Sequence, residues 1–529
     1  MKPGQPIPPI EFGSGAASAS EHFGGHRVEL SHEWLEQLRA ACAEVDLSHA
    51  ALAEAGRDWW PFAQHWALVG ETPARAGAVA RPATVAEVAA IARLCSETGV
   101  PLTAAGGRSG VCGASVPVFG GVVLDLCGLA GILAVDSESL LVDVAAGTFG
   151  SDFERELQAQ HGLTVGHWPQ SMDLATVGGW IACRGVGQYS TRYGKIEDIV
   201  AGLEVVLASG EILRTGAMAG AGPRSAMGPD LTQLFVGNEG TLGIITAARL
   251  RAHPVPVAEE RLAFGFPSFD AGLDVLRRTL QRGATPAVVR LYDERESLRS
   301  FEIPTNVLIA LDEGDPQVIG AAMAVLTEEC EAAGADGLDV GIVQHWLEHR
   351  NDVSALAAVT RAGIVVDTIE IAAPWASLAG IYADAVAALE AVDGCLAASA
   401  HESHAYIDGA CLYFTFAGRQ PADDDRLTEA PASPTDLVEI EAEADERWAE
   451  HFYRSAWTAV LTATRSHGGS ISHHHGIGLV RAPYLAEALG SGFAVLEALK
   501  KTLDPSGVLN PGKLGLGSPF GPSPWPTTP

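Results

Sequence analysis

The sequence of 529 residues contains no run of about 18 apolar residues, the length that a membrane-spanning helix needs. Its first 15 residues lack the apolar segment of a secretory signal, and its 8 cysteines include no C-x-x-C pair. Scattered cysteines in a long chain are typical of a reducing compartment. These absences predict a cytoplasmic protein without a transmembrane segment, and they leave peripheral membrane contact open.

Positive charge is also scarce. The chain has 34 Lys and Arg against 65 Asp and Glu, a formal charge of −31. A field of this sign repels nucleic acid, so a nucleic-acid partner is excluded. A small-molecule or lipid-like substrate remains, and one that carries phosphate would need a local basic pocket. Oligomeric state is left open, with a homodimer among the options.

The chain is roughly three times as long as a usual domain, so we expect two or three domains. Composition and pattern divide it into an N-terminal disordered or helical extension (1–74), an α+β domain (75–255), a second α+β domain (256–435), a C-terminal helical region (436–516) and a disordered tail (517–529).

Local signals predict individual elements. Thr84 and Glu87 are spaced as a capping box, and Gly99 ends the helix that follows. A strand at 101–104 then leads into a glycine-rich loop. Further strands are predicted at 122–126, 140–144, 203–207, 244–250, 288–292, 307–311 and 412–416, and helices at 31–42, 269–281, 317–333, 374–391 and 437–465, with an exposed charged loop at 419–435.

Three loops of the first α+β domain carry the residues suited to a phosphate-bearing cofactor. They lie at 104–110, 166–180 and 237–245, and each is rich in glycine and small polar residues. Glycines let backbone N–H groups approach a diphosphate closely. Neither G-x-G-x-x-G nor G-x-x-x-x-G-K-[ST] occurs, so the sequence supports neither a Rossmann nor a P-loop site.

A second group of candidate residues is rich in histidine. Three consecutive histidines stand in Ser472-His473-His474-His475-Gly476. If this stretch is extended, His473 and His475 share one face and His474 lies opposite. Proton transfer and metal binding are both open to imidazole. No neighbouring carboxylate or cysteine completes a ligand set in sequence, so we expect no metal.

The order of the three loops resembles the FAD domain of the vanillyl-alcohol oxidase and para-cresol methylhydroxylase superfamily. The ending 503–513 resembles a C-terminal signature of its oxidase branch. This resemblance implies an α+β fold, with a two-subdomain FAD-binding domain, an α+β cap and a C-terminal helical segment. Arg108 stands where some relatives tether flavin through histidine, which implies non-covalent FAD. The implied FAD-binding residues are Ala105, Gly106, Gly107, Arg108, Ser109, Gly110, Gln170, Ser171, Thr176, Gly178, Gly179, Ala182, Arg184, Gly185, Glu239, Gly240, Thr241, Gly243 and Ile244.

Within the superfamily, four stretches resemble the alkylglycerone-phosphate synthases: 472–478, 408–414, 372–375 and 290–293. The resemblance implies exchange of the acyl group of acyl-dihydroxyacetone phosphate for a fatty alcohol. It implies catalytic roles for Tyr413, His167, His473, His474 and His475, and phosphate recognition by Arg290.

His401 and His404 are further candidates for substrate or metal contact. Flavin-linked dehydrogenases of 2-hydroxy acids such as lactate or glycolate also carry histidines in the cap. A dehydrogenase or oxidase of that kind is therefore the alternative function. A non-enzymatic FAD-binding protein is the third hypothesis, and the polar residues beside the flavin disfavour it.

Overall fold

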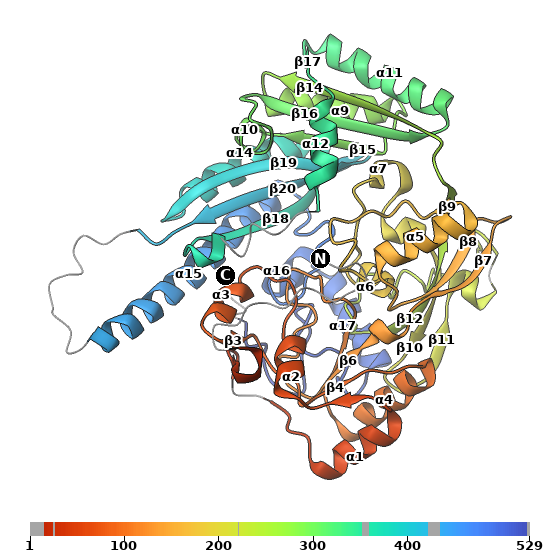
Figure 1. Ribbon diagram of the computed structural model, residues 1–529, viewed down its shortest axis with the longest axis vertical. Helices are drawn as coiled ribbons and strands as arrows, with labels where there is room; N and C mark the ends of the chain where they lie inside the picture. The colour runs from red at the N-terminus through yellow and green to blue at the C-terminus, as the bar shows by residue number, and fades with distance from the viewer. Residues whose placement is uncertain (1–14, 25–26, 221, 352–358, 422–433, 526–529) are drawn as a thin grey trace.

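The computed structural model describes residues 15–24, 27–220, 222–351, 359–421 and 434–525. Figure 1 shows a cap, coloured green to cyan, above a larger half coloured mainly red to yellow. The cap holds one seven-stranded sheet, and the other half, which we call the FAD-binding half, holds a four-stranded and a five-stranded sheet. The predicted α+β class is confirmed. Among the described residues, none of the helices combines the length and hydropathy that crossing a bilayer requires.

The four-stranded sheet of the FAD-binding half is built around a parallel β-α-β unit. Helix α4 has the predicted capping box of Thr84 and Glu87, and Gly99 ends it in the left-handed conformation. Its apolar face is buried against the sheet. The strand order is β2 (Val45–Asp46), β4 (Ala78–Ala80), β6 (Val122–Asp125) and β5 (Leu102–Ala105), and α1 (His32–Ala41), α2 (His49–Ala55) and α4 (Val85–Thr98) pack beside it.

The five-stranded sheet is antiparallel. Its order is β11 (Ile212–Arg214), β10 (Val200–Val206), β12 (Ile244–Arg251), β8 (Leu141–Ala145) and β7 (Ile132–Asp136). Helices α5 (Gly150–His161) and α6 (Val177–Ala182) contact it. The loops that precede α6 and β12 are therefore held by one rigid layer.

The cap sheet is also antiparallel, and it ends at strand β18, which has a neighbour on one side only. Its order is β17 (Asp336–Gly337), β14 (Ala258–Phe266), β16 (Asn306–Gly314), β15 (Val288–Tyr292), β19 (Cys395–Ala405), β20 (Gly409–Gly418) and β18 (Val365–Pro374). The helices that contact it include α9 (Phe269–Gln281), α11 (Pro316–Ala332), α14 (Trp375–Glu390) and α15 (Pro434–Ser466).

Shorter elements connect these layers. They are η1 (Ala16–Ser18), β1 (Ser20–Glu21), α3 (Ala63–Leu68), β3 (Glu71–Thr72), η2 (Leu126–Gly128), β9 (Leu163–Thr164), α7 (Ser190–Tyr193), α8 (Ile196–Ile199), η3 (Gly216–Ala219), β13 (His253–Pro254), α10 (Glu294–Phe301), α12 (Gly341–His349), α16 (Ala482–Leu489) and α17 (Gly492–Leu503).

The described parts of both chain ends contact the rest of the fold. Residues 20–21 pair with β3, and β2 adds a strand to the first sheet. Near the other end, Trp525 is buried against Trp60. Burial of a large aromatic ring stabilises a segment whose Pro and Gly content indicates disorder. Residues 1–14, 526–529 and most of the predicted charged loop (422–433) lie outside the described residues.

One buried carboxyl group in the cap generates a stability prediction. Both oxygens of Glu402, on β19, lack a partner among the described residues, and burial raises its pKa to about 8. The folded protein therefore holds a proton that the unfolded chain loses above about 4.5. Stability should be fully present below that pH and fall as the pH rises toward 8.

We expect Glu402→Gln to stabilise the protein at neutral pH by about 1–3 kcal/mol, because the neutral amide removes the cost of protonating the carboxylate on folding. Thermal unfolding of both proteins at pH 5 and pH 8 measures the difference, which should be small at the lower value and large at the higher. Melting temperatures that change in parallel with pH would contradict this account.

Candidate active site in the cofactor cavity

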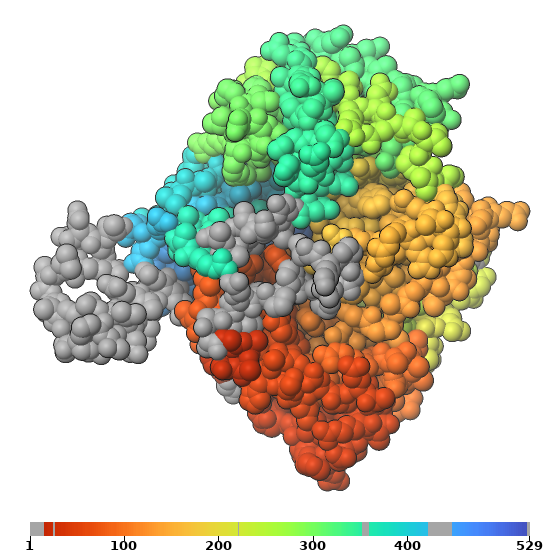
Figure 2. Space-filling model, in the orientation of Figure 1, coloured from red at the N-terminus to blue at the C-terminus, as the bar shows by residue number. Residues whose placement is uncertain are grey.

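A cavity of about 1060 Å³ lies between the FAD-binding half and the cap. Its lining includes all three predicted loops, residues of the cap strands and two of the three consecutive histidines. Figure 2 shows the cap seated directly on the half below it. Ligand pockets usually measure about 300–1,000 Å³, so there is room for a dinucleotide cofactor and part of a substrate.

Most of the predicted cofactor residues meet in this cavity. Arg184 and Thr241 are not among the residues that line it. Arg184 turns to an ion pair with Glu197 at 3.2 Å, and the Thr241 hydroxyl donates to the carbonyl of Asn238. The residues that do line the cavity are Ala105, Gly106, Gly107, Arg108, Ser109, Gly110, Gln170, Ser171, Thr176, Gly178, Gly179, Ala182, Gly185, Glu239, Gly240, Gly243 and Ile244.

The glycines of the first loop are also required for packing between two of the loops. A Cβ atom on Gly107 would lie 1.8 Å from the carbonyl oxygen of Leu174, and one on Gly106 would lie 2.3 Å from the hydroxyl of Thr176. The first loop therefore needs glycine to pack against the second loop. Their close packing gives the cavity a continuous wall of main chain, which fits a dinucleotide.

The N-terminal extension contributes wall residues that the sequence analysis missed. Asp58, Trp59 and Pro61 line the cavity, and the backbone N–H of Trp59 donates to Gly110 in the first loop at 2.8 Å. Burial raises the pKa of Asp58 to about 7. The aromatic stretch 59–62 was visible in sequence, but its composition indicates packing as readily as a cofactor wall.

The histidine loop, residues 470–478, is held by buried carboxylates. Glu370 on β18 accepts hydrogen bonds from the backbone N–H groups of His473 and His475, the latter at 2.9 Å. Glu239 accepts from Ile477 at 2.6 Å and from Gly478 at 2.8 Å. Glu239, predicted to bind the cofactor, thus lines the cavity and also fixes this loop.

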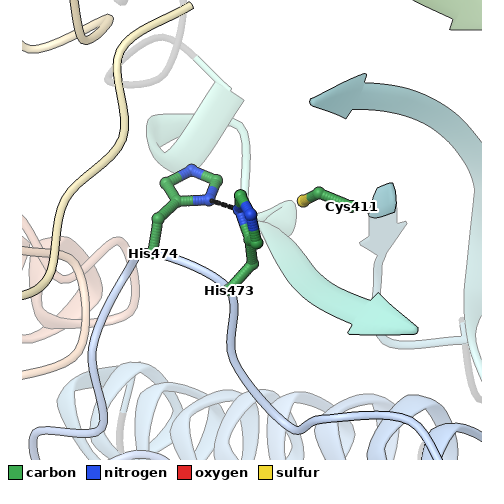
Figure 3. A group of neighbouring side chains, drawn as sticks. All are labelled: Cys411, His473 and His474. Atoms are coloured by element: carbon green, nitrogen blue, oxygen red, sulfur yellow. Dashed lines mark hydrogen bonds between the residues drawn. The ribbon is translucent and has the colours of Figure 1, made fainter. Parts of the chain in front are cut away.

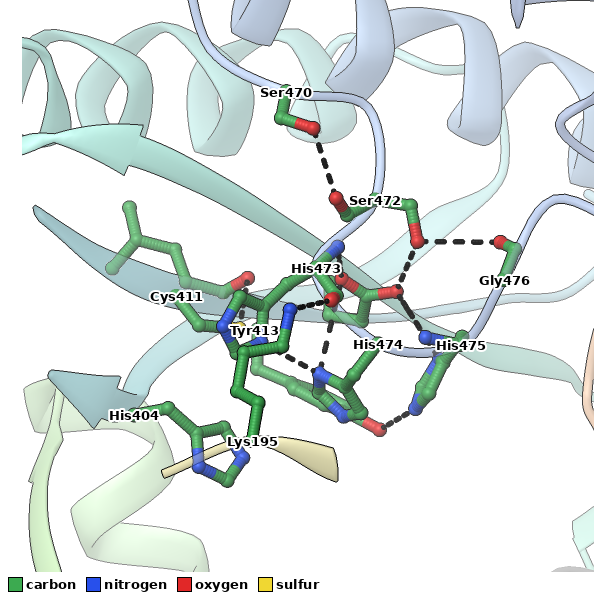
Figure 4. Close-up of polar contacts among 12 residues, drawn as sticks. Lys195, His404, Cys411, Tyr413, Ser470, Ser472, His473, His474, His475 and Gly476 are labelled. Atoms are coloured by element: carbon green, nitrogen blue, oxygen red, sulfur yellow. Dashed lines mark hydrogen bonds and ion pairs between the residues drawn. The ribbon is translucent and has the colours of Figure 1, made fainter. Parts of the chain in front are cut away.

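The three histidines do not alternate as an extended strand would place them. His473 and His474 share a hydrogen bond of 2.9 Å between their Nδ1 atoms, and the rings of His474 and His475 lie 4.5 Å apart. His474 and His475 line the cavity, whereas His473 does not. The loop bends because its N–H groups converge on one carboxylate, and Figure 4 shows the three rings gathered beside Tyr413.

Tyr413 and His475 form the shortest link between the cap sheet and the histidine loop. The Tyr413 hydroxyl lies 2.6 Å from Nε2 of His475. Burial raises the pKa of Tyr413, and burial lowers the pKa of His475 to about 4. Both groups are therefore neutral near pH 7.

His167 is placed away from this group. It is fully buried, its ring lies 4.6 Å from that of Trp180, and it is not among the residues that line the cavity. Burial lowers its pKa to about 3. The structure therefore does not bring His167 together with the other predicted catalytic residues.

Cys411 stands behind the histidine loop, with its sulfur facing His473 (Figure 3). Its Sγ and a nitrogen of each of His473 and His474 lie within 4.8 Å of one another. The fold therefore brings a cysteine next to the histidines that is about 60 residues away in the sequence. The two imidazoles already bond to each other, and Nζ of Lys195 lies 2.9 Å from the His473 carbonyl. A lysine ammonium here disfavours a further cation, and the expectation of no metal stays a prediction.

Arginines of the cap face the same cavity. Arg290 donates to Nε2 of His401 at 2.7 Å and to the Tyr292 hydroxyl at 2.9 Å. The Arg290 and Arg350 guanidinium groups lie 5.6 Å and 5.3 Å from the ring centre of Trp346. Stacking on an aromatic ring orients a guanidinium group, so this wall presents fixed positive charge. His404, predicted to contact substrate, also lines the cavity and bonds to Ser190 at 3.0 Å.

Comparison with protein families matches both halves of the chain. Residues 76–216 match the family described as "FAD binding domain", and residues 255–514 match "FAD linked oxidases, C-terminal domain".

The relatives of similar sequence include an uncharacterized oxidoreductase, a synthase and an oxidase subunit. An uncharacterized FAD-linked oxidoreductase, YgcU, of Escherichia coli strain K12 is 30% identical over 436 residues, which cover 79% of this chain and 83% of that protein. The alkyldihydroxyacetonephosphate synthase of Dictyostelium discoideum is 28% identical over 84% of this chain and 74% of its own. Glycolate oxidase subunit GlcD of Bacillus subtilis is 29% identical over 83% of this chain and 88% of its own.

Solved structures share the fold. An alkyldihydroxyacetonephosphate synthase superposes with a TM-score of 0.71 at 23% identity, covering 96% of this chain and 90% of that one. Substrate-bound p-cresol methylhydroxylase superposes with a TM-score of 0.71 at 16% identity, covering 92% and 96%. The predicted superfamily resemblance and FAD as the cofactor are confirmed.

The contact between the first two loops predicts the effect of one substitution. Gly107→Ala places a methyl group against backbone, so the loops must separate and the purified protein should hold at least about tenfold less flavin, a loss of about 1.4 kcal/mol in binding. The ratio of flavin to protein absorbance measures this. Gly320→Ala is the matched control, because a Cβ atom there meets nothing within 4 Å. Full flavin content in Gly107→Ala would contradict the account.

Non-covalent attachment has its own test. Acid precipitation of the purified protein should leave all of the flavin in the supernatant. Yellow colour that stays with the precipitated chain would contradict the expectation drawn from Arg108.

Proposed function

We propose a specific reaction for this chain, which belongs to the FAD-linked oxidase family and uses FAD as its cofactor. In this proposal it exchanges the acyl group of an acyl-dihydroxyacetone phosphate for a fatty alcohol, as alkylglycerone-phosphate synthases do. The observation that carries the proposal is a single cavity whose lining combines three kinds of residue: fixed arginines, a Tyr–His hydrogen-bonded pair and a set of apolar side chains on the cap.

An apolar part of the lining supports a substrate with an alkyl chain. It lies on the cap side, where Ile364, Val366, Leu396, Ala397 and Ala417 line the cavity. The side chain of Leu396 is also exposed at the surface. Each buried methylene contributes about 0.8 kcal/mol, so even a few carbons against these residues would bind appreciably.

The arginine wall supports an anionic headgroup. Arg290 keeps a fixed direction because His401 and Tyr292 accept hydrogen bonds from two of its N–H groups. The guanidinium of Arg350 stacks on Trp346, which also lines the cavity. Guanidinium groups bind phosphate through two parallel hydrogen bonds. In a chain of net charge −31, such a wall supplies the local positive potential that a phosphate needs.

The Tyr413 and His475 pair supports proton handling beside the headgroup. Tyr413 lines the cavity and can give its proton to Nε2 of His475, and the reverse step returns it. His474, which also lines the cavity, stands next to this pair. FAD, when bound, supplies the reactive isoalloxazine ring for the exchange.

The proposal predicts ether formation by the flavin-loaded protein. Incubation with palmitoyl-dihydroxyacetone phosphate and hexadecanol should yield the alkyl ether and palmitate, which mass spectrometry detects. Tyr413→Phe should lower turnover by at least about 100-fold with flavin content unchanged, because it removes the proton donor. Tyr382→Phe is the matched control, since this hydroxyl bonds to Asp293 outside the cavity lining.

The alternative gives a different result in the same preparation. If lactate or glycolate bleaches the flavin without oxygen, and no ether forms, the chain is a 2-hydroxy-acid dehydrogenase. That outcome would overturn the proposed exchange reaction.

A further inference from the structure

Glu370 lies on strand β18 of the cap sheet, where this sheet contacts the histidine loop. In the register of the sheet, Glu370 on β18 is the direct partner of Tyr413 on β20, and His401 on β19 is the partner of Tyr413 on its other side. Directly opposed residues of neighbouring strands project from the same face. The carboxylate and the phenol therefore point to the same side of the sheet.

β18 is the edge strand of this sheet, and the histidine loop covers that edge. Ala372 of β18 forms a bridge with Ser470, and the Ser472 hydroxyl donates to Oε1 of Glu370 at 3.0 Å. With the backbone N–H groups of His473 and His475, three donors of the loop end on this carboxylate. A carboxylate with several hydrogen-bond donors is held in one orientation.

Arg481 is the fully buried ion-pair partner of Glu370. Its guanidinium forms an ion pair of 3.0 Å with Oε1 of Glu370, and both side chains are fully buried. It also donates to the carbonyl of Gly476 at 2.8 Å and lies 4.9 Å from the ring centre of Trp457. Although burial opposes ionisation, Arg481 lowers the pKa of Glu370, so the carboxylate is charged at neutral pH.

The charge of Glu370 faces the imidazole that accepts from Tyr413. The negative charge of Glu370 beside Nδ1 favours an N–H over a lone pair at that atom, so in the neutral ring Nε2 is the acceptor of the phenol proton. That Nδ1 atom is buried, has no hydrogen-bond partner among the described residues, and lies 3.9 Å from Oε1 of Glu370. Tyr413, His475 and Glu370 are thus arranged as donor, base and carboxylate.

We infer that Glu370 is a positioning residue for the Tyr413–His475 pair, holding the imidazole against the phenol and stabilising the imidazolium that forms on proton transfer. In that step the phenol O–H bond breaks and an N–H bond forms at Nε2, so a phenolate and an imidazolium replace two neutral groups. A carboxylate beside Nδ1 offsets the new positive charge. The inference rests on the proposed role of this pair in catalysis.

The titratable and charged groups that contact or electrostatically influence His475 come from the cap sheet, the histidine loop and the residues that follow it. Tyr413 and Glu370 belong to the cap sheet, Arg481 follows the loop, and His474 is the neighbouring ring. Glu370 raises the pKa of His475, whereas Arg481 lowers it. Neutralising Glu370 should therefore lower the pKa of His475, and neutralising Arg481 should raise it. A general loss of loop order would not produce shifts in opposite directions.

Three variants test the inference. Glu370→Gln should lower turnover by about 10- to 100-fold with KM changed by less than threefold, because it removes the charge that favours proton transfer. Ser472→Ala, the matched control, removes one loop contact to Glu370 and keeps the charge, so turnover should change by less than about threefold. Arg481→Met should shift the titration of His475 upward by about one pH unit, and Glu370→Gln should shift it downward.

The titration of His475 is followed by NMR of protein with labelled histidine, assigned with His475→Gln, and it needs no substrate. If Glu370→Gln and Ser472→Ala lower turnover equally, or if the two charge variants shift His475 in the same direction, Glu370 only tethers the loop and the inference is wrong. If Tyr413→Phe is fully active while the opposite shifts are found, the proposed function fails and the placement of Glu370 stands.

Removal of one member of a buried ion pair can also prevent folding. If Glu370→Gln alone does not retain flavin, the double variant Glu370→Gln with Arg481→Met removes both charges together and should retain it. The turnover of this double variant should still be at least about tenfold below that of Ser472→Ala. Equal turnover would overturn the inference.

Discussion

Four backbone N–H groups of the histidine loop end on two buried carboxylates, one from each half of the molecule. His473 and His475 donate to Glu370 of the cap, and two residues farther along the loop donate to Glu239 of the FAD-binding half. Because buried N–H groups require acceptors, the loop can take this conformation only when both halves are in place. The positions of His474 and His475 in the cavity depend on these bonds.

Electrostatics follow from the same burial. The chain as a whole is strongly acidic, yet the cavity combines stacked arginines and neutral imidazoles, and the carboxylate of Glu370 next to His475 is paired with Arg481. Burial lowers the pKa of His473 to about 3 and that of His475 to about 4, so both stay neutral near pH 7. A neutral imidazole beside a protonated phenol is the state in which a proton can move from one to the other.

Local signals in the sequence predict local structure well. The capping box at Thr84 and the helix 269–281 are found as predicted, because each depends on residues a few positions apart. The meeting of the three glycine-rich loops also follows from a recognisable pattern, and 15 of the cofactor residues predicted within them line one cavity. Glu370 carries no such signal, since an isolated Glu in an apolar strand has the same sequence pattern whether it faces solvent or holds a loop. The bend of the histidine loop, the proximity of Cys411 and the burial of Trp525 are likewise set by contacts between residues far apart in the chain, which periodicity does not encode.

The central claim is that the hydrogen bonds of the histidine loop to Glu370 and Glu239 place His475 against Tyr413 in the cavity that holds FAD. A crystal structure of the flavin-loaded protein tests it most directly. The account predicts FAD along the three glycine-rich loops, with Glu370 and Glu239 each accepting two N–H groups of the histidine loop and the Tyr413 hydroxyl within hydrogen-bond distance of His475. A structure in which the loop has left either carboxylate, or in which the flavin ring lies away from Tyr413, would contradict it.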